Sequence, residues 1–192
     1  MQGKQVNLQI SGGFFLMLSA ALLILPLRFV AGWLIAASVH ELAHILVIKD
    51  HVIGMKILPL GAKIETMPIA PEQELLAALA GPLASLLLII SYRVFPSVAI
   101  CGLIQFLYNM IPVYPMDGGR VIRCIIIRLC GISQANNIMH VVRVLILLLL
   151  LLFSCYTTIV FKTALPALVS IILIVRSAKG KIPCKYRVRG VQ

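Results

Sequence analysis

The chain has 192 residues, of which 61% are hydrophobic and only 12% carry a formal charge. A soluble domain contains roughly 25% charged residues, so this composition excludes a soluble enzyme, a disulfide scaffold and a disordered tail protein. The length is enough for one ordinary domain or for about six crossings of a bilayer. The chain contains 17 Lys and Arg residues but only six Asp and Glu residues. Because acids are so few, the position of each one helps to locate a possible active site.

Apolar segments follow one another along the chain and predict membrane-spanning helices. They occupy residues 5–27, 29–48, 75–92, 94–116, 144–161 and 163–175. A spanning helix needs about 17–25 mostly apolar residues, which four of these runs supply outright. The second run is interrupted by one polar cluster. The last two spans must fit within residues 138–175, which is possible if the basic side chains at their ends extend to the membrane interface.

Basic residues indicate the orientation of these spans. With six spans and a cytoplasmic N-terminus, only Arg28, Arg93 and Lys162 fall outside the cytoplasmic face. Positively charged loops stay in the cytoplasm, so this distribution favours six spans with both termini cytoplasmic. Basic charges directly after a span more often contact anionic lipid than nucleic acid, and we expect no nucleic-acid partner.

The segment Val52–Met67 separates the second span from the third. Apolar residues flank Pro59 and Gly61, a pattern that favours a short hairpin dipping into the membrane interface. The edge of such a hairpin could capture an extended substrate by adding a strand. A loop that only seals the site fits the same residues, because strand signals this short are ambiguous.

The expected fold class is therefore an all-α polytopic membrane protein. It should have about six transmembrane helices, with a short membrane-associated hairpin between the second and the third. We expect a membrane domain over residues 1–176 and a basic cytoplasmic tail over residues 177–192.

The polar cluster in the second span is His40-Glu41-Leu42-Ala43-His44. Residues four apart lie on one helix face, so both imidazoles can reach one metal ion, while Glu41 can approach a metal-bound water. The alternative is two polar-facing histidines and a glutamate paired with a neighbour. Each such group costs roughly 2.5–3.5 kcal/mol in a membrane helix, so the cluster needs a compensating partner, and a divalent cation is the natural one.

Two histidines leave a catalytic zinc site short of one protein ligand. Asp50 and His51 follow the second span too closely to fold back onto His44, and three glutamates lie in or beside the next loop. Asp117 is the better candidate, because it ends an apolar run within a Pro- and Gly-rich segment that excludes a continuous helix. Irregular backbone at membrane depth is tolerated where it lines a wet cavity. The alternative for Asp117 is an ordinary turn aspartate before Gly-Gly.

Two motifs on separate spans resemble those of the site-2 proteases, zinc metalloproteases that cut inside the membrane. They are H-E-x-x-H at residues 40–44 and N-x-x-P-x-x-P-x-D-G at residues 109–118. Ala80-Gly81-Pro82 resembles the family's A-G-P, and Leu58-Pro59-Leu60-Gly61 resembles its membrane-associated hairpin. The layout is most similar to the stage IV sporulation protein FB branch, which processes a pro-sigma factor.

The chain departs from that branch in three places. Members often continue into a CBS domain, which we do not expect after the short basic tail. Gly61-Ala62 stands where many relatives have Gly-Gly, and Ser85 stands where some carry Asn. These departures affect the assignment to a branch more than the chemistry.

The resemblance implies a site with one catalytic Zn²⁺. The implied metal ligands are His40, His44 and Asp117, the implied general base is Glu41, and Asn109 and Gly61 would contact the substrate. Asn109 would help hold the substrate carbonyl or the developing oxyanion. The other reading is a buried amide bonded to backbone that Pro112 or Pro115 leaves unpaired.

The function that the resemblance implies is an intramembrane zinc metalloendopeptidase in a bacterial cell membrane. Its substrate would be a membrane-associated pro-sigma factor in a sporulating bacterium, or alternatively an anti-sigma factor, and an inhibitory membrane protein is a further expected partner. A metal transporter or sensor is a second hypothesis. The sequence disfavours it, because it contains one cluster of ligands rather than a ladder of intramembrane acids. A catalytically inactive scaffold is a third, against which the complete ligand and base set argues.

Overall fold

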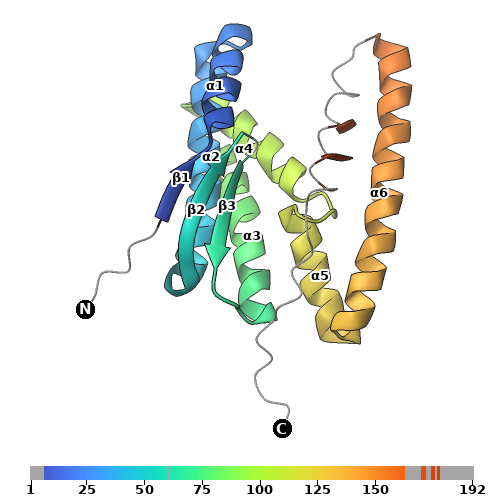
Figure 1. Ribbon diagram of the computed structural model, residues 1–192. Helices are drawn as coiled ribbons and strands as arrows, with labels where there is room; N and C mark the ends of the chain where they lie inside the picture. The colour runs from blue at the N-terminus through green and yellow to red at the C-terminus, as the bar shows by residue number, and fades with distance from the viewer. Residues whose placement is uncertain (1–6, 60, 163–169, 172–173, 176, 178–192) are drawn as a thin grey trace, which may run out of the picture. The chain divides into compact units, whose positions relative to one another are not determined.

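The structure is a computed structural model that describes residues 7–59, 61–162, 170–171, 174–175 and 177 (Figure 1). The chain forms two compact units, of which the first ends at Asn109 and the second begins at Met110.

The described part of the first unit contains four α-helices and two short 3-10 turns. These are α1 (Gly12–Ile24), α2 (Leu27–Ile48), η1 (Lys49–His51), α3 (Pro71–Leu87), η2 (Leu88–Arg93) and α4 (Pro96–Asn109). Both α3 and α4 begin with proline, which is suited to the first helical position because its missing N–H has no helical partner there. Helices α2, α3 and α4 pack against one another.

Two glycines allow the backbones of these helices to approach closely. A Cβ on Gly32 of α2 would lie 2.9 Å from the carbonyl oxygen of Ser97 in α4. A Cβ on Gly102 of α4 would lie 2.6 Å from the carbonyl oxygen of Ser85 in α3. Because no side chain fits in these spaces, the two glycines set how tightly α4 packs on its neighbours.

A three-stranded sheet in the order β1-β2-β3 belongs to the same unit. Its strands are β1 (Asn7–Ile10), β2 (Val52–Leu58) and β3 (Gly61–Thr66). β2 and β3 pair antiparallel, so residues 52–66 form a hairpin, and β1 pairs parallel to β2 on the opposite edge. Gly61 has a φ of 131° at the hairpin turn, a backbone conformation that favours glycine.

The sheet packs on the ends of α2 and α3 through a small apolar core. Ile48 of α2, Val52 of β2, Ala77 of α3 and Ile69, which precedes α3, are buried together, and Ile64 of β3 packs against them. This core attaches the hairpin to α3 and to α2, the helix that carries the polar cluster. The hairpin is thereby positioned beside the second half of α2.

The second unit contains α5 (Asp117–Cys130) and α6 (Ile132–Phe161), which pack against each other. Gly131 between them has a φ of 82°, which explains why glycine occupies this junction. The buried Arg123 of α5 donates from Nη2 to Oδ1 of Asn136 in α6, at 3.3 Å.

Among the described residues, three helical segments are long and apolar enough to cross a membrane. They are Leu27–His51, Pro71–Arg93 and Ile132–Val160, and α1 and α4 are shorter apolar helices. The count of six spans therefore stays a prediction. The predicted last span at 163–175 and the basic tail at 177–192 lie outside the described residues, except for isolated positions.

The structure differs from the all-α expectation in its sheet, and most clearly in β1. We expected a single span over residues 5–27, but Asn7–Ile10 form a strand and α1 begins at Gly12. The expected apolar run 94–116 is also divided, since α4 ends at Asn109. Pro112 and Pro115 follow, and proline cannot donate the backbone hydrogen bonds that would continue a helix.

Candidate metal centre

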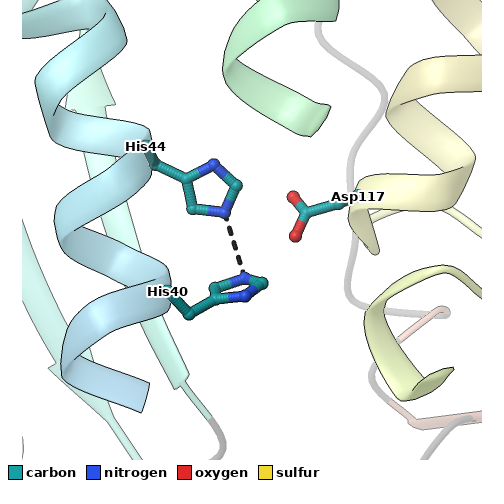
Figure 2. Close-up of side chains that lie close together, drawn as sticks. All are labelled: His40, His44 and Asp117. Atoms are coloured by element: carbon teal, nitrogen blue, oxygen red, sulfur yellow. Dashed lines mark hydrogen bonds between the residues drawn. The ribbon is translucent and has the colours of Figure 1, made fainter. Parts of the chain in front are cut away.

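His40 and His44 lie one turn apart on α2, and both are buried. Their imidazoles face each other, with Nε2 of His44 3.1 Å from Nε2 of His40 and the ring planes at 85° (Figure 2). The spacing of four residues therefore places both rings on one helix face, as the sequence predicts.

Helix α3 supplies a partner for the outer nitrogen of each ring. Nδ1 of His44 lies 2.7 Å from the backbone oxygen of Ala77, and Nδ1 of His40 lies 2.9 Å from Oγ of Ser85. A carbonyl oxygen only accepts hydrogen bonds, so Nδ1 of His44 carries the proton and donates it to Ala77. In neutral His44 this leaves the lone pair on Nε2, the form that binds a metal.

Gly81 lies between these two contacts on α3. A Cβ at Gly81 would fall 2.9 Å from Cε1 of His40 and would overlap the ring of His44. Ala77, Gly81 and Ser85 are spaced by four residues and share one helix face. Both imidazoles pack against this face of α3.

Glu41 contacts the hairpin. The backbone N–H of Ala62 in β3 donates to Oε1 of Glu41 at 3.2 Å. Ala62 is paired with Ile57 across the hairpin. This hydrogen bond links the carboxylate beside His40 to the strand that follows Gly61.

Asp117 is the first residue of α5 in the second unit (Figure 2). Its side chain is buried. Nη1 of Arg120 lies 3.3 Å from Oδ1 of Asp117. The two glycines after Asp117 meet the preceding loop: a Cβ on Gly118 would lie 2.9 Å from the oxygen of Ile111, and one on Gly119 2.8 Å from the oxygen of Val113. Asp117 therefore begins a helix that is packed tightly onto the irregular segment before it.

Asn109 and Gly61, the other two predicted site residues, lie at the end of α4 and at the start of β3. Asn109 is the last residue of α4, and its Nδ2 donates to the backbone oxygen of Gln105 at 3.1 Å. Gly61 opens β3 at the hairpin turn. Two of the three glutamates near the loop before the third span, Glu72 and Glu74, lie in the first turn of α3.

Sequence reasoning assigned no site role to Ala77 or Ser85. Both contacts join residues more than 30 positions apart, 33 for Ala77 with His44 and 45 for Ser85 with His40. The available signal was the four-residue spacing of Ala77, Gly81 and Ser85, which repeats the spacing of the two histidines. Only the packing of α3 on α2 shows that the two series face each other.

No protein-family model matches the chain. A zinc metalloprotease of Methanocaldococcus jannaschii is 32% identical over 139 residues, which cover 62% of this chain and 40% of that protein. A candidate zinc metalloprotease of Synechocystis sp. is also 32% identical over 139 residues, covering 62% of this chain and 36% of that protein. The chain thus spans about two fifths of the length of these curated relatives.

A solved structure has a similar fold over nearly the whole chain. The site-2 protease from Methanocaldococcus jannaschii matches with a TM-score of 0.67 and 22% identity, covering 96% of this chain and 94% of that one. The chain therefore has a site-2-protease-like fold, and it is similar in sequence to proteins named as zinc metalloproteases.

Proposed function

We propose that the chain is an intramembrane zinc metalloendopeptidase of the site-2 protease type, with Zn²⁺ held by His40, His44 and Asp117. These three buried residues each offer one nitrogen or oxygen donor, the composition of a candidate metal site. The observation that carries the proposal is the hydrogen bonding of the histidines. With Nδ1 of each ring turned to a partner on α3, both Nε2 atoms are directed to the same place.

The donor set fits zinc. Neutral imidazole and carboxylate are ligands that Zn²⁺ accepts, and three protein ligands leave a fourth position for water or substrate. When bound, the ion would activate a water and polarise the scissile carbonyl. The similarity to zinc metalloproteases and the site-2-protease-like fold support this assignment.

Glu41 is the proposed general base and acid. It lies one residue from His40 and therefore beside the donor atoms without being one of them. Its carboxylate would take a proton from the attacking water and return one to the leaving amine. The hydrogen bond from Ala62 N–H restricts where this carboxylate can lie, so β3 takes part in orienting the base.

Asn109 is a proposed donor to the developing oxyanion. One amide hydrogen is used in the bond to Gln105, and an Asn amide has a second. One donor of this kind typically contributes about 2.7–4 kcal/mol to lowering the barrier.

We infer that the hairpin receives the substrate in extended form. A helical substrate hides its carbonyls, so its backbone must be opened before hydrolysis, and a strand added to a sheet edge is held open. β3 is an edge strand. Its Ala62 N–H donates to Glu41, so an extended segment paired with the part of this edge beyond Ala62 would pass next to the base.

A Glu41→Gln variant tests the catalytic proposal. The purified variant should keep one zinc per chain and lose cleavage of a membrane-tethered substrate, since the amide cannot accept the proton. A metal transporter using the same residues would instead keep metal flux across vesicles in this variant. Zinc-loaded wild-type chain that cleaves none of the candidate membrane substrates would contradict the proposal.

We further propose a membrane-associated pro-sigma factor as the substrate, with an anti-sigma factor as the alternative. Co-expression of each candidate with the wild-type chain or with Glu41→Gln separates them, because only the true substrate shortens and only with the wild type. We place the chain in a bacterial cell membrane with six spans and both termini cytoplasmic. Accessibility of engineered tags at each terminus tests that topology.

A further inference from the structure

The partner of His40 differs in kind from the partner of His44. His44 donates to the backbone carbonyl of Ala77, which accepts hydrogen bonds whatever the side chain is. His40 faces the hydroxyl of Ser85 at 2.9 Å, and both side chains are buried, at 2% and 0% exposure. A hydroxyl can either donate or accept, and it is removed by a single substitution.

Serines in helices ordinarily bond back to a carbonyl of their own helix. Ser38 does so with Leu34 in α2, and Ser19 does so with Phe15 in α1. Ser85 instead makes a hydrogen bond to a side chain of another helix, 45 residues away. Its contact is therefore with His40 and is not the local bond that the exposed serines Ser38 and Ser19 make.

The backbone of Ser85 is held in place from the far side. A Cβ on Gly102 of α4 would lie 2.6 Å from the carbonyl oxygen of Ser85, so α4 packs directly on this turn of α3. Ser85 thus sits between α4 and His40. A side chain confined in this way can fix the orientation of the ring it contacts.

We propose that Ser85 is a positioning residue for the metal ligand His40. Its Oγ accepts the hydrogen of Nδ1, which keeps the lone pair on Nε2 and holds the ring in the plane that presents this atom to the metal. The proposal rests on the proposed zinc site and adds to it a residue that touches neither metal nor substrate. Outer partners of this kind typically change metal affinity by about 10–100-fold.

Competition of the purified full-length chain with a chromophoric zinc chelator tests this assignment. We expect Ser85→Ala to bind Zn²⁺ about 10–100-fold more weakly than wild type, because Nδ1 of His40 loses the hydroxyl that it contacts. Ser85→Thr keeps a hydroxyl and should restore affinity to within a few-fold. Ser38→Ala is the control for removing a hydroxyl near His40, since the exposed Ser38 lies two residues before it and bonds to its own helix.

A second readout separates positioning from loss of structure. The Co²⁺-substituted chain reports ligand geometry through its visible absorption, which should change in Ser85→Ala and return in Ser85→Thr. The zinc-free Ser85→Ala and Ser38→Ala chains should both unfold cooperatively, with Ser85→Ala the less stable of the two because it loses a buried hydrogen bond.

The outcomes distinguish the proposed role of Ser85 from the proposed zinc site. If wild type binds one zinc and Ser85→Ala binds it equally well with an unchanged Co²⁺ spectrum, the role of Ser85 is overturned and the zinc site stands. If wild type binds no zinc, both are overturned.

Discussion

Gly81 of α3 packs directly on the imidazole of His44, so that a Cβ at Gly81 would lie only 2.5 Å from Cε1 of that ring. The same Cβ would meet Cε1 of His40 at 2.9 Å. Only glycine therefore fits beside the two imidazole rings. This close packing explains the glycine of the A-G-P motif.

Gly81→Ala should weaken zinc binding by about 10–100-fold, comparable to losing an outer partner of the ligands, because the new methyl displaces both rings. Overpacking of this kind also typically lowers stability by about 1–3 kcal/mol. Zinc competition and thermal unfolding of the purified variant measure the two effects. Gly12→Ala is the control, since a Cβ at Gly12 has no atom within 4 Å. Equal zinc affinity in both variants would contradict this account of Gly81.

Ala62→Pro should lower the turnover rate while leaving zinc affinity unchanged. Proline removes the N–H that donates to Glu41, and β3 is an edge strand, where proline is tolerated. We expect a reduction of roughly tenfold or more, because a hydrogen bond to a charged group contributes about 1.5–3 kcal/mol and about 1.4 kcal/mol corresponds to a factor of ten.

Ala62→Gly is the matched control for this substitution, because it shortens the side chain and keeps the N–H. Cleavage kinetics of the two variants, with zinc content measured alongside, give the comparison. An Ala62→Pro chain that turns over as fast as Ala62→Gly would show that the hydrogen bond does not orient the base.

The features of the site that could be predicted from the sequence are those determined within a single helix. The face shared by His40 and His44 follows from their spacing of four residues, and the end of α4 at Asn109 follows from the prolines after it. The start of α3 at Pro71 has an equally local cause, because proline and two acids suit the first helical turn.

The remaining features arise from packing between segments that are distant in the sequence. The strand β1 is only four residues long, and all four are exposed, so no alternation of buried residues marks it. Its strand conformation depends on pairing with β2, more than 40 residues later. The contacts of Ser85 and Ala77 with the histidines likewise depend on the register of α3 against α2, which a single sequence does not reveal.

Asp117→Ala should weaken zinc binding by more than the roughly 10–100-fold typical of an outer partner, because it removes a proposed ligand itself. Asp50→Ala is the control, since Asp50 is an exposed acid in η1 directly after α2 and was the nearer candidate along the chain. Zinc stoichiometry and affinity of both purified variants decide between the two acids. The assignment of Asp117 fails if Asp50→Ala loses zinc and Asp117→Ala retains it.

Removal of zinc should lower the thermal stability of the chain, because an ion that binds only the folded state stabilises it. With free zinc at about 100 times Kd, this contribution is about 2.7 kcal/mol. Thermal unfolding in detergent, with and without a strong chelator, measures the shift. Glu41→Gln should show the wild-type shift because it keeps all three proposed ligands, whereas His40→Ala should show little or none. A full shift in His40→Ala would mean that the stabilising ion binds elsewhere, which would remove the link between this histidine pair and the metal.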